Sequence, residues 1–237
     1  MPWFFIDYWY IVLVLPAMLF ALIASASVNS TFEKYAKQRS MRGLTGAEAA
    51  RMVLDANGLH NVQIRRVNGK LTDHYDPRDN TIYLSDSVHD NASTAAIGVA
   101  AHEAGHAVQH ATHYLPIKIR SAIIPVTNFG SRLAIPLILI GLLLGAWSGN
   151  YTLAVVGIIC FSLTAVFQLV TLPTEFNASG RAMRALEGCQ ILSGEELAGA
   201  RKVLSAAAMT YVAALAVSLA QLLRLVLIVA GNSRRRN

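Results

Sequence analysis

Four long apolar runs constrain this chain more than any other feature of its sequence. They cover about residues 9–28, 133–147, 151–172 and 206–230. Runs of roughly 20 apolar residues are long enough to cross the ~30 Å hydrocarbon layer of a bilayer as helices. Composition agrees: 54% of the 237 residues are hydrophobic and only 14% are charged, whereas soluble domains carry about 25% charged residues. The sequence therefore predicts a mainly α integral membrane protein.

The two middle runs predict a helical hairpin. A single helix from 133 to 172 would be ~60 Å long, twice the hydrocarbon thickness. The uncharged sequence S-G-N at 148–150 separates the runs and favours a turn. Because two crossings return the chain to its starting face, a residue just after the hairpin lies on the same side of the membrane as the polar segment before it.

The first run predicts a retained membrane anchor, with a cleaved signal peptide as the alternative. The sequence A-S-A at 24–26 resembles a signal-peptidase site. A secretory signal normally begins with a basic region, but residues 1–10 hold no Lys or Arg and include Asp7. The aromatic residues around Trp9 are typical of a membrane interface.

Between the first two runs, residues 31–132 are polar enough to fold in water. Thr45 and Glu48 form a capping-box pattern that predicts the start of a helix, and Gly58 predicts its end. A second helix is expected to open at Ser93-Thr94 and to end before Pro116.

The same segment predicts a small β-structure. Residues 62–67 alternate in polarity as a strand does, and the following Asn68-Gly69 predicts a hairpin turn. Residues 81–85 predict a further strand, which is also a candidate edge for holding an extended peptide.

Residues 102–106, H-E-A-G-H, match the pattern H-E-x-x-H. On a helix, His102 and His106 lie one turn apart on the same face, so both imidazoles can bind one zinc ion. Glu103 then lies beside the metal and can act as a base. The alternative at this point is an ordinary amphipathic helix with two histidines.

A catalytic zinc usually has three protein ligands. Cys160 lies in an apolar run and Cys189 in a short loop, so a thiolate ligand is not indicated. Glu175 directly follows the predicted hairpin and returns to the face that carries His102. This topology makes Glu175 a candidate third ligand.

Several separated stretches resemble the YugP-type neutral zinc metallopeptidases, which are broadly similar to the HtpX and Ste24-type membrane peptidases. The stretches are 71–77 (L-T-D-H-Y-D-P), 84–85 (L-S), 100–109 (A-A-H-E-A-G-H-A-V-Q), 172–179 (L-P-T-E-F-N-A-S) and 210–214 (T-Y-V-A-A). The resemblance implies a zincin-like α+β catalytic domain, one catalytic Zn²⁺ held by His102, His106 and Glu175, and Glu103 as the base. Asn177 and Ser179 depart from these family patterns, in which aspartates are expected, and this bears on what supports the zinc-binding histidines.

Five other residues are candidates for supporting the ligands or binding substrate, each with a simpler structural alternative. His110 continues the face of His106, although a surface histidine explains it equally well. His74 lies in a turn-rich loop that favours a structural role. The set is His110, Tyr83, His74, Tyr211 and Arg184.

The predicted organisation has five parts. They are an anchor at 1–30, a zincin-like domain with the H-E-x-x-H helix at 31–132, a transmembrane hairpin at 133–172, a segment supplying the third ligand at 173–205, and a C-terminal transmembrane helix with a basic tail at 206–237. Basic residues after the first run place the polar side in the cytoplasm, whereas the basic tail at 234–236 argues for the opposite orientation. Arg224, within the last run, is expected to extend to the lipid headgroups.

The predicted function is a zinc-dependent membrane metalloendopeptidase of the bacterial plasma membrane, with its active site on the cytoplasmic side. Its expected partners are a peptide or protein substrate, membrane-associated proteins included, and the lipid bilayer. The net charge is +6, but the sequence lacks the basic, aromatic-interleaved surface that is typical of nucleic-acid binding. The competing hypothesis is a non-catalytic scaffold or pseudo-peptidase braced by zinc, and a transporter is a third.

Overall fold

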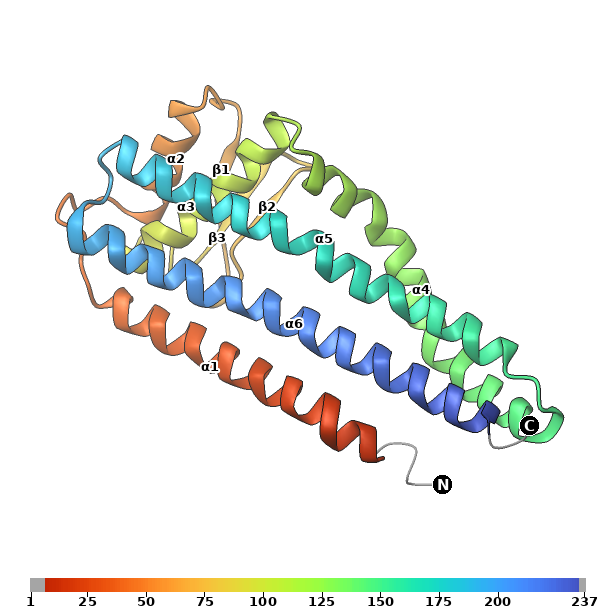
Figure 1. The fold of residues 1–237 in the computed structure, drawn as a ribbon. Helices are drawn as coiled ribbons and strands as arrows, with labels where there is room; N and C mark the ends of the chain where they lie inside the picture. The colour runs from red at the N-terminus through yellow and green to blue at the C-terminus, as the bar shows by residue number, and fades with distance from the viewer. Residues whose placement is uncertain (1–6, 235–237) are drawn as a thin grey trace. The chain divides into compact units, whose positions relative to one another are not determined.

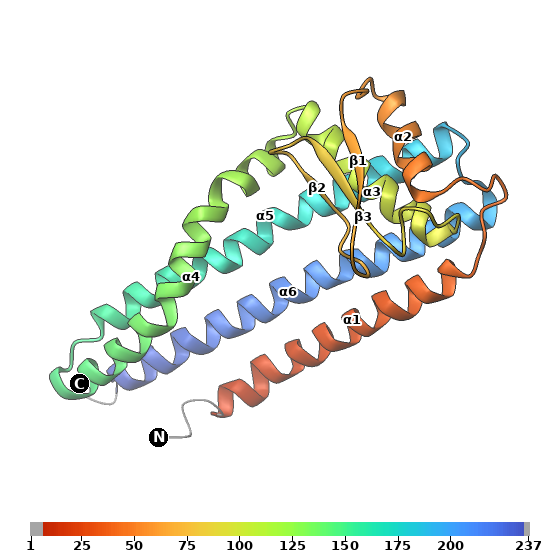
Figure 2. The ribbon, with the colours of Figure 1, turned by 180° about the vertical axis from the view of Figure 1, so that it is seen from behind.

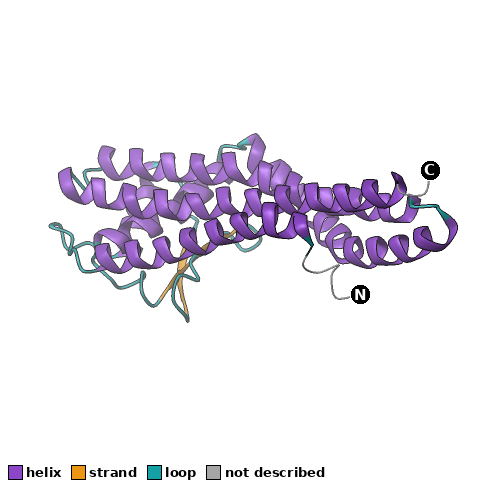
Figure 3. Ribbon diagram, turned by 60° about the horizontal axis from the view of Figure 1, so that its bottom comes forward, coloured by secondary structure: helices purple, strands orange, loops and turns teal. Residues whose placement is uncertain are grey.

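The computed structural model describes residues 7–234, and these are mainly helical (Figure 3). A π-helical turn, η2, at Tyr10–Val14 leads directly into the first α-helix. The α-helices are α1 (Leu15–Ala36), α2 (Gly46–Ala56), α3 (Thr94–Ala111), α4 (Leu115–Ser148), α5 (Thr152–Gly188) and α6 (Gly194–Arg234). The strands are β1 (Gln63–Val67), β2 (His74–Asp76) and β3 (Thr81–Ser85).

The chain forms two compact units. Among the described residues, the membrane unit comprises 7–23, 119–172 and 211–234, and the polar unit comprises Ala24–Lys118 and Pro173–Thr210. Within residues 7–234, four helices are long and apolar enough to cross a membrane: Tyr10–Ala36, Leu115–Ser148, Thr152–Gly188 and Gly194–Asn232. The prediction of a four-span membrane protein with a small sheet is therefore confirmed.

In the membrane unit, α4 and α5 form the predicted hairpin. The turn between them contains Gly149 at φ +78°, and the Asn150 side chain accepts a hydrogen bond from the Thr152 backbone N–H at 2.9 Å. Glycines allow the two helices to pack closely: a Cβ on Gly141 would overlap the Ala154 nitrogen. Such close backbone approach is typical of helix pairs in membranes.

In the polar unit, α3 lies between the sheet on one side and α5 and α6 on the other (Figures 1 and 2). Both predicted caps are confirmed. Thr45 and Glu48 make the reciprocal bonds of a capping box at α2, and the Ser93 side chain accepts a hydrogen bond from the Ala96 N–H at α3. Small side chains on α3 let neighbouring elements approach this helix closely. The alanines that are almost fully buried in the core are Ala95, Ala96, Ala100, Ala101, Ala104 and Ala107.

The sheet has the order β1-β3-β2, with β1 parallel and β2 antiparallel to β3. The prediction that Asn68-Gly69 makes a hairpin from β1 is wrong. The chain does turn there, with Gly69 at φ +118°, but the hairpin joins β2 to β3 instead. Four of the five β3 residues are buried, so this strand takes the centre and β1 pairs with it in parallel.

The central position of β3 also corrects a functional expectation. Since β1 and β2 pair with its two edges, β3 has no free edge with which to hold a peptide. Within the described residues, the outer edges of this sheet belong to β1 and β2.

Candidate metal centre

His102 and His106 on α3 and Glu175 on α5 converge in the polar unit. Each offers a ligand atom within 4.8 Å of the others. The Glu175 Oε2 atom lies 3.3 Å from His102 Nε2 and 3.6 Å from His106 Nε2. Glu175 is 2% exposed and His106 is 9% exposed, so the group forms a largely dehydrated site.

These spacings fit a zinc ion. Zinc binds His nitrogen and carboxylate oxygen at about 2.0–2.2 Å in tetrahedral geometry, so two ligand atoms should lie about 3.4 Å apart. The two measured separations lie near this value. The donor set of two histidines and one glutamate is also one that catalytic zinc sites use.

The outward nitrogen of each imidazole is engaged, which leaves Nε2 to face the metal position. His106 Nδ1 lies 3.0 Å from Gln109 Oε1. Since an amide oxygen only accepts, this nitrogen carries the proton, and Nε2 keeps the lone pair that a metal requires. His102 Nδ1 lies 3.1 Å from Ser179 Oγ, which can accept in the same way.

The Gln109 side chain connects the two helices that supply the ligands. It is fully buried, and its Nε2 donates to the Thr174 carbonyl at 2.8 Å and to Asn177 Oδ1 at 3.1 Å. The carbonyl bond fixes the amide orientation, because a carbonyl can only accept. Asn177 Oδ1 also accepts from Arg181 Nε at 2.8 Å.

Asn177 and Ser179, the departures from the family patterns, therefore both belong to this supporting network. Gln109 was not singled out from the sequence. Its position three residues after His106, on the same helical face, is the signal that could have identified it.

Close approach of α3 and α5 brings the ligands within reach of one another. A Cβ on Gly105 would lie 2.7 Å from the Ala178 carbonyl oxygen, so only glycine fits this crossing. Gly105 lies between the ligands on α3, and Ala178 follows Glu175 on α5. The glycine of the H-E-A-G-H sequence is thus explained by packing.

Glu103 is 8% exposed and lies on α3 next to His102. Burial lowers the pKa of His106, but the Glu175 hydrogen bond and the charges of Glu103 and Glu175 raise it above its ordinary value overall. Two buried carboxylates thus stabilise positive charge at this position. Such an environment suits a bound cation.

The loop before β2 also approaches this carboxylate. Asp73 accepts hydrogen bonds from the Ser85 N–H at 2.7 Å and the Ser85 hydroxyl at 3.0 Å. Burial, together with the negative charge of Glu103, raises the pKa of Asp73. The turn expected for the D-H-Y-D-P sequence is corrected: His74–Asp76 form strand β2, and Asp73, just before it, anchors the end of β3.

The other candidate residues are not part of the three-ligand group. The His110 ring lies 5.4 Å from that of Tyr75, and the His74 ring stacks on Tyr83 at 5.0 Å. The Tyr83 hydroxyl donates to Asp79 at 2.6 Å. Tyr211 belongs to the membrane unit, whereas the three ligands belong to the polar unit.

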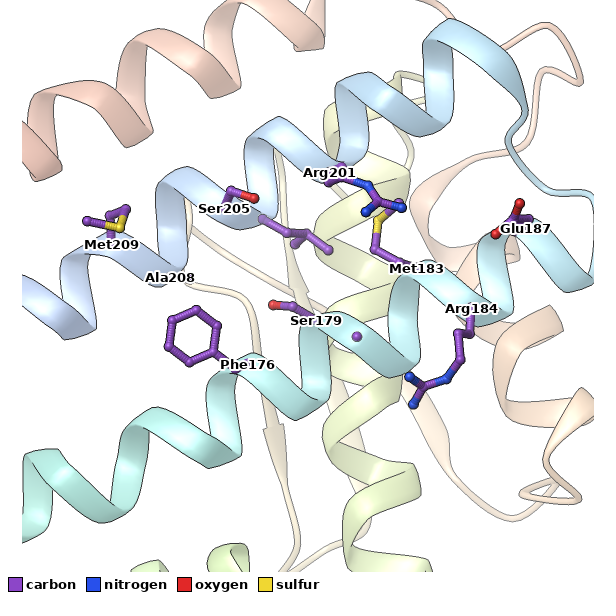
Figure 4. A pocket seen from close by; sticks show the side chains of 11 residues that line it. Phe176, Ser179, Met183, Arg184, Glu187, Arg201, Ser205, Ala208 and Met209 are labelled. Atoms are coloured by element: carbon purple, nitrogen blue, oxygen red, sulfur yellow. The ribbon is translucent and has the colours of Figure 1, made fainter.

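A cavity of about 550 Å³ lies between α5 and α6 in the polar unit (Figure 4). Phe176 and Met209 line one end, and Arg201 and Glu187 line the other. Ser179 lines it as well and contacts His102 on its other side. The cavity is therefore separated from His102 by one serine side chain.

Comparison with known proteins agrees with this geometry. Residues 10–230 match the model of a family described as "Putative neutral zinc metallopeptidase". The chain is 47% identical over 219 residues to the "Putative membrane protease YugP" of Bacillus subtilis (strain 168), covering 92% of this chain and 96% of that protein. No solved structure matches the chain. Because the family model matches nearly the whole chain and the relative is 47% identical over 92% of it, the chain belongs to this neutral zinc metallopeptidase family.

Proposed function

We propose that this membrane protein is a zinc-dependent endopeptidase, with one Zn²⁺ held by His102, His106 and Glu175 and with Glu103 as the general base. The observation that carries the proposal is the spacing of Glu175 Oε2 from the two Nε2 atoms, at 3.3 and 3.6 Å. Three protein ligands leave a fourth tetrahedral position for water or substrate, as catalytic sites do and closed structural sites do not.

A zinc ion at this position supplies Lewis acidity, which polarises a peptide carbonyl and makes water more acidic. Glu103 accepts the proton from the attacking water and delivers it to the leaving amine. Its place next to His102 on the same helix keeps its carboxylate beside the reacting atoms. A zinc that only braced the fold would have no use for such a base.

The expected substrate is a peptide or protein, and proximity to the membrane favours membrane-associated ones. Glu175 follows the apolar run that ends at 172 by three residues, or ~4.5 Å along a helix. Basic residues at 34, 37, 39 and 42 support a cytoplasmic polar unit. We assign the protein to the bacterial plasma membrane, with the active site on the cytoplasmic side.

The deciding experiment compares the purified protein with Glu103→Gln for zinc content and for cleavage of an unfolded membrane-protein substrate. The variant should retain stoichiometric zinc, because Glu103 is not a ligand, and should lose cleavage. Cleavage at the wild-type rate by Glu103→Gln would refute the assignment of the base. Zinc binding without cleavage in the wild-type protein would instead favour the non-catalytic scaffold.

A further inference from the structure

A second cavity, of about 220 Å³, lies where α2, α3 and α5 meet in the polar unit. Asn57 and Val53 of α2 form one wall, Gly105 of α3 another, and Arg181 and Arg184 of α5 the third. In Figure 4 the Arg184 side chain points away from α6. Arg184 also lines the larger cavity between α5 and α6, so its side chain contributes to both cavities.

The smaller cavity carries positive charge that nothing in its lining compensates. Two guanidinium groups line it, and its lining includes no carboxylate. Within residues 7–234, neither arginine has an ion-pair partner. The Val53 carbonyl, near the end of α2, already accepts a hydrogen bond from Asn57 at 2.7 Å, so it is not left to pair with the arginines.

The Arg181 guanidinium is held in position. Its Nε donates to Asn177 Oδ1 at 2.8 Å, and the group lies 5.9 Å from the centre of the Tyr114 ring. A guanidinium has five N–H donors in a rigid fork, so most of its donors are not used by Asn177. A fixed fork loses little entropy when it binds a planar or tetrahedral oxyanion.

We propose that this cavity binds a small oxyanion, with inorganic phosphate as the best match. Two guanidinium groups recognise phosphate or carboxylate oxygens through paired hydrogen bonds. The volume is below the ~300–1,000 Å³ of ordinary small-molecule pockets, which excludes a whole nucleotide or lipid headgroup with its chains. None of the three candidate zinc ligands lines this cavity.

The oxyanion site is connected to a zinc ligand by hydrogen bonds. Arg181 Nε and Gln109 Nε2 both donate hydrogen bonds to Asn177 Oδ1. Gln109 Oε1 in turn accepts a hydrogen bond from His106 Nδ1. An anion that fixes the Arg181 side chain also stabilises this series of hydrogen bonds and so slows the loss of zinc. The oxyanion site is a regulatory site, and its existence does not depend on peptidase activity.

The test is calorimetric titration of the full-length protein in detergent with sodium phosphate and, separately, sodium acetate. It is made on the zinc-loaded protein and on protein stripped with a chelator. Phosphate should bind both forms. Arg184→Gln should weaken binding by about tenfold or more, the effect of removing one charged hydrogen-bond partner. Arg184 makes no contact in the hydrogen-bond chain, so this variant leaves the support of His106 intact.

Arg201→Gln is the matched control, because Arg201 is also exposed but lines the other cavity; it should bind phosphate as the wild type does. Tighter binding of acetate than of phosphate would identify a carboxylate as the ligand. Three results would each overturn the site: no binding of either anion, equal loss in Arg201→Gln, or binding only when zinc is present, which would place the anion at the metal.

A second measurement tests the connection to His106. Transfer of zinc to a chromogenic chelator should be slower in phosphate than in a chloride buffer of equal ionic strength. The slowing should disappear in Arg181→Gln. Equal slowing in the wild type and in Arg181→Gln would refute the proposed coupling.

Discussion

Gln109 Nε2 donates to the Thr174 carbonyl at 2.8 Å, so the side chain that orients His106 also holds the residue that precedes Glu175. One buried amide thereby connects two helices that carry candidate ligands and lie far apart in sequence. Metal-binding histidines depend on such partners for their tautomer and ring orientation.

Replacing Gln109 by Leu should weaken zinc binding by about 10–100-fold, the usual effect of removing the partner of a ligand histidine. It should also lower stability by ~1–3 kcal/mol, because the buried His106 Nδ1 group loses its hydrogen-bond partner. Competition with a chelator measures the affinity, and thermal unfolding of the zinc-free protein measures the stability.

Gln109→Glu is the companion variant. It keeps an oxygen for His106 but removes the donor to Thr174, so zinc affinity should fall less than in Gln109→Leu while stability still falls. Wild-type zinc affinity in Gln109→Leu would contradict the role given to this residue.

Ser179 supports the other histidine. Ser179→Ala should lower zinc affinity by about tenfold, because His102 Nδ1 loses the oxygen at 3.1 Å. Ser179→Asp should restore or increase the affinity, since a carboxylate accepts this hydrogen bond more strongly. Ser205→Ala is the control, because Ser205 lines the same cavity and is exposed. An equal effect of the Ser205 and Ser179 substitutions to Ala would show that the cavity, and not His102, is being perturbed.

The features that the sequence predicted correctly are those encoded locally. The H-E-A-G-H helix is specified by its cap at Ser93 and by helical spacing, and the α4–α5 hairpin by the turn near Gly149. Glu175 was a candidate from the predicted topology and from the family resemblance, and the structure brings it within 4.8 Å of His102 and His106.

The features that were missed depend on contacts between distant segments. The strong turn at Asn68-Gly69 did not decide strand pairing, because burial of β3 placed that strand in the centre. Likewise, Ser179 lies 77 residues from the histidine it contacts. The H-E-A-G-H pattern identifies His102 as a candidate ligand, but it does not identify the distant residue that orients the imidazole.

Glu175→Ala should lose zinc, because two histidines alone leave two tetrahedral positions without protein ligands. Glu187→Ala is the matched control on the same helix, where the glutamate is exposed. Metal analysis by mass spectrometry should find stoichiometric zinc in the control and little in Glu175→Ala. Full zinc occupancy in Glu175→Ala would mean that the third ligand lies elsewhere.

Arg224 in the last span is not free to extend to the headgroups, as its sequence position suggested. Its side chain is 5% exposed and pairs with Asp7 at 2.6 Å, and its guanidinium lies 5.4 Å from the Tyr10 ring centre. Asp7 also accepts from the Tyr10 N–H at 2.9 Å. The pair joins the N-terminal helix to α6 within the membrane unit, where an isolated charge would be costly.

This pair should show strong coupling in a double-mutant cycle. Asp7→Asn removes the carboxylate that pairs with the buried Arg224 and should destabilise the protein by about 3–5 kcal/mol, whereas Arg224→Gln leaves the half-buried Asp7 and should cost less. The double variant removes both charges, so it should be less destabilised than the sum of the single variants. Thermal unfolding in detergent measures all four proteins. Additive effects would show that Asp7 and Arg224 are each solvated separately, and that the first helix is held to α6 by apolar packing alone.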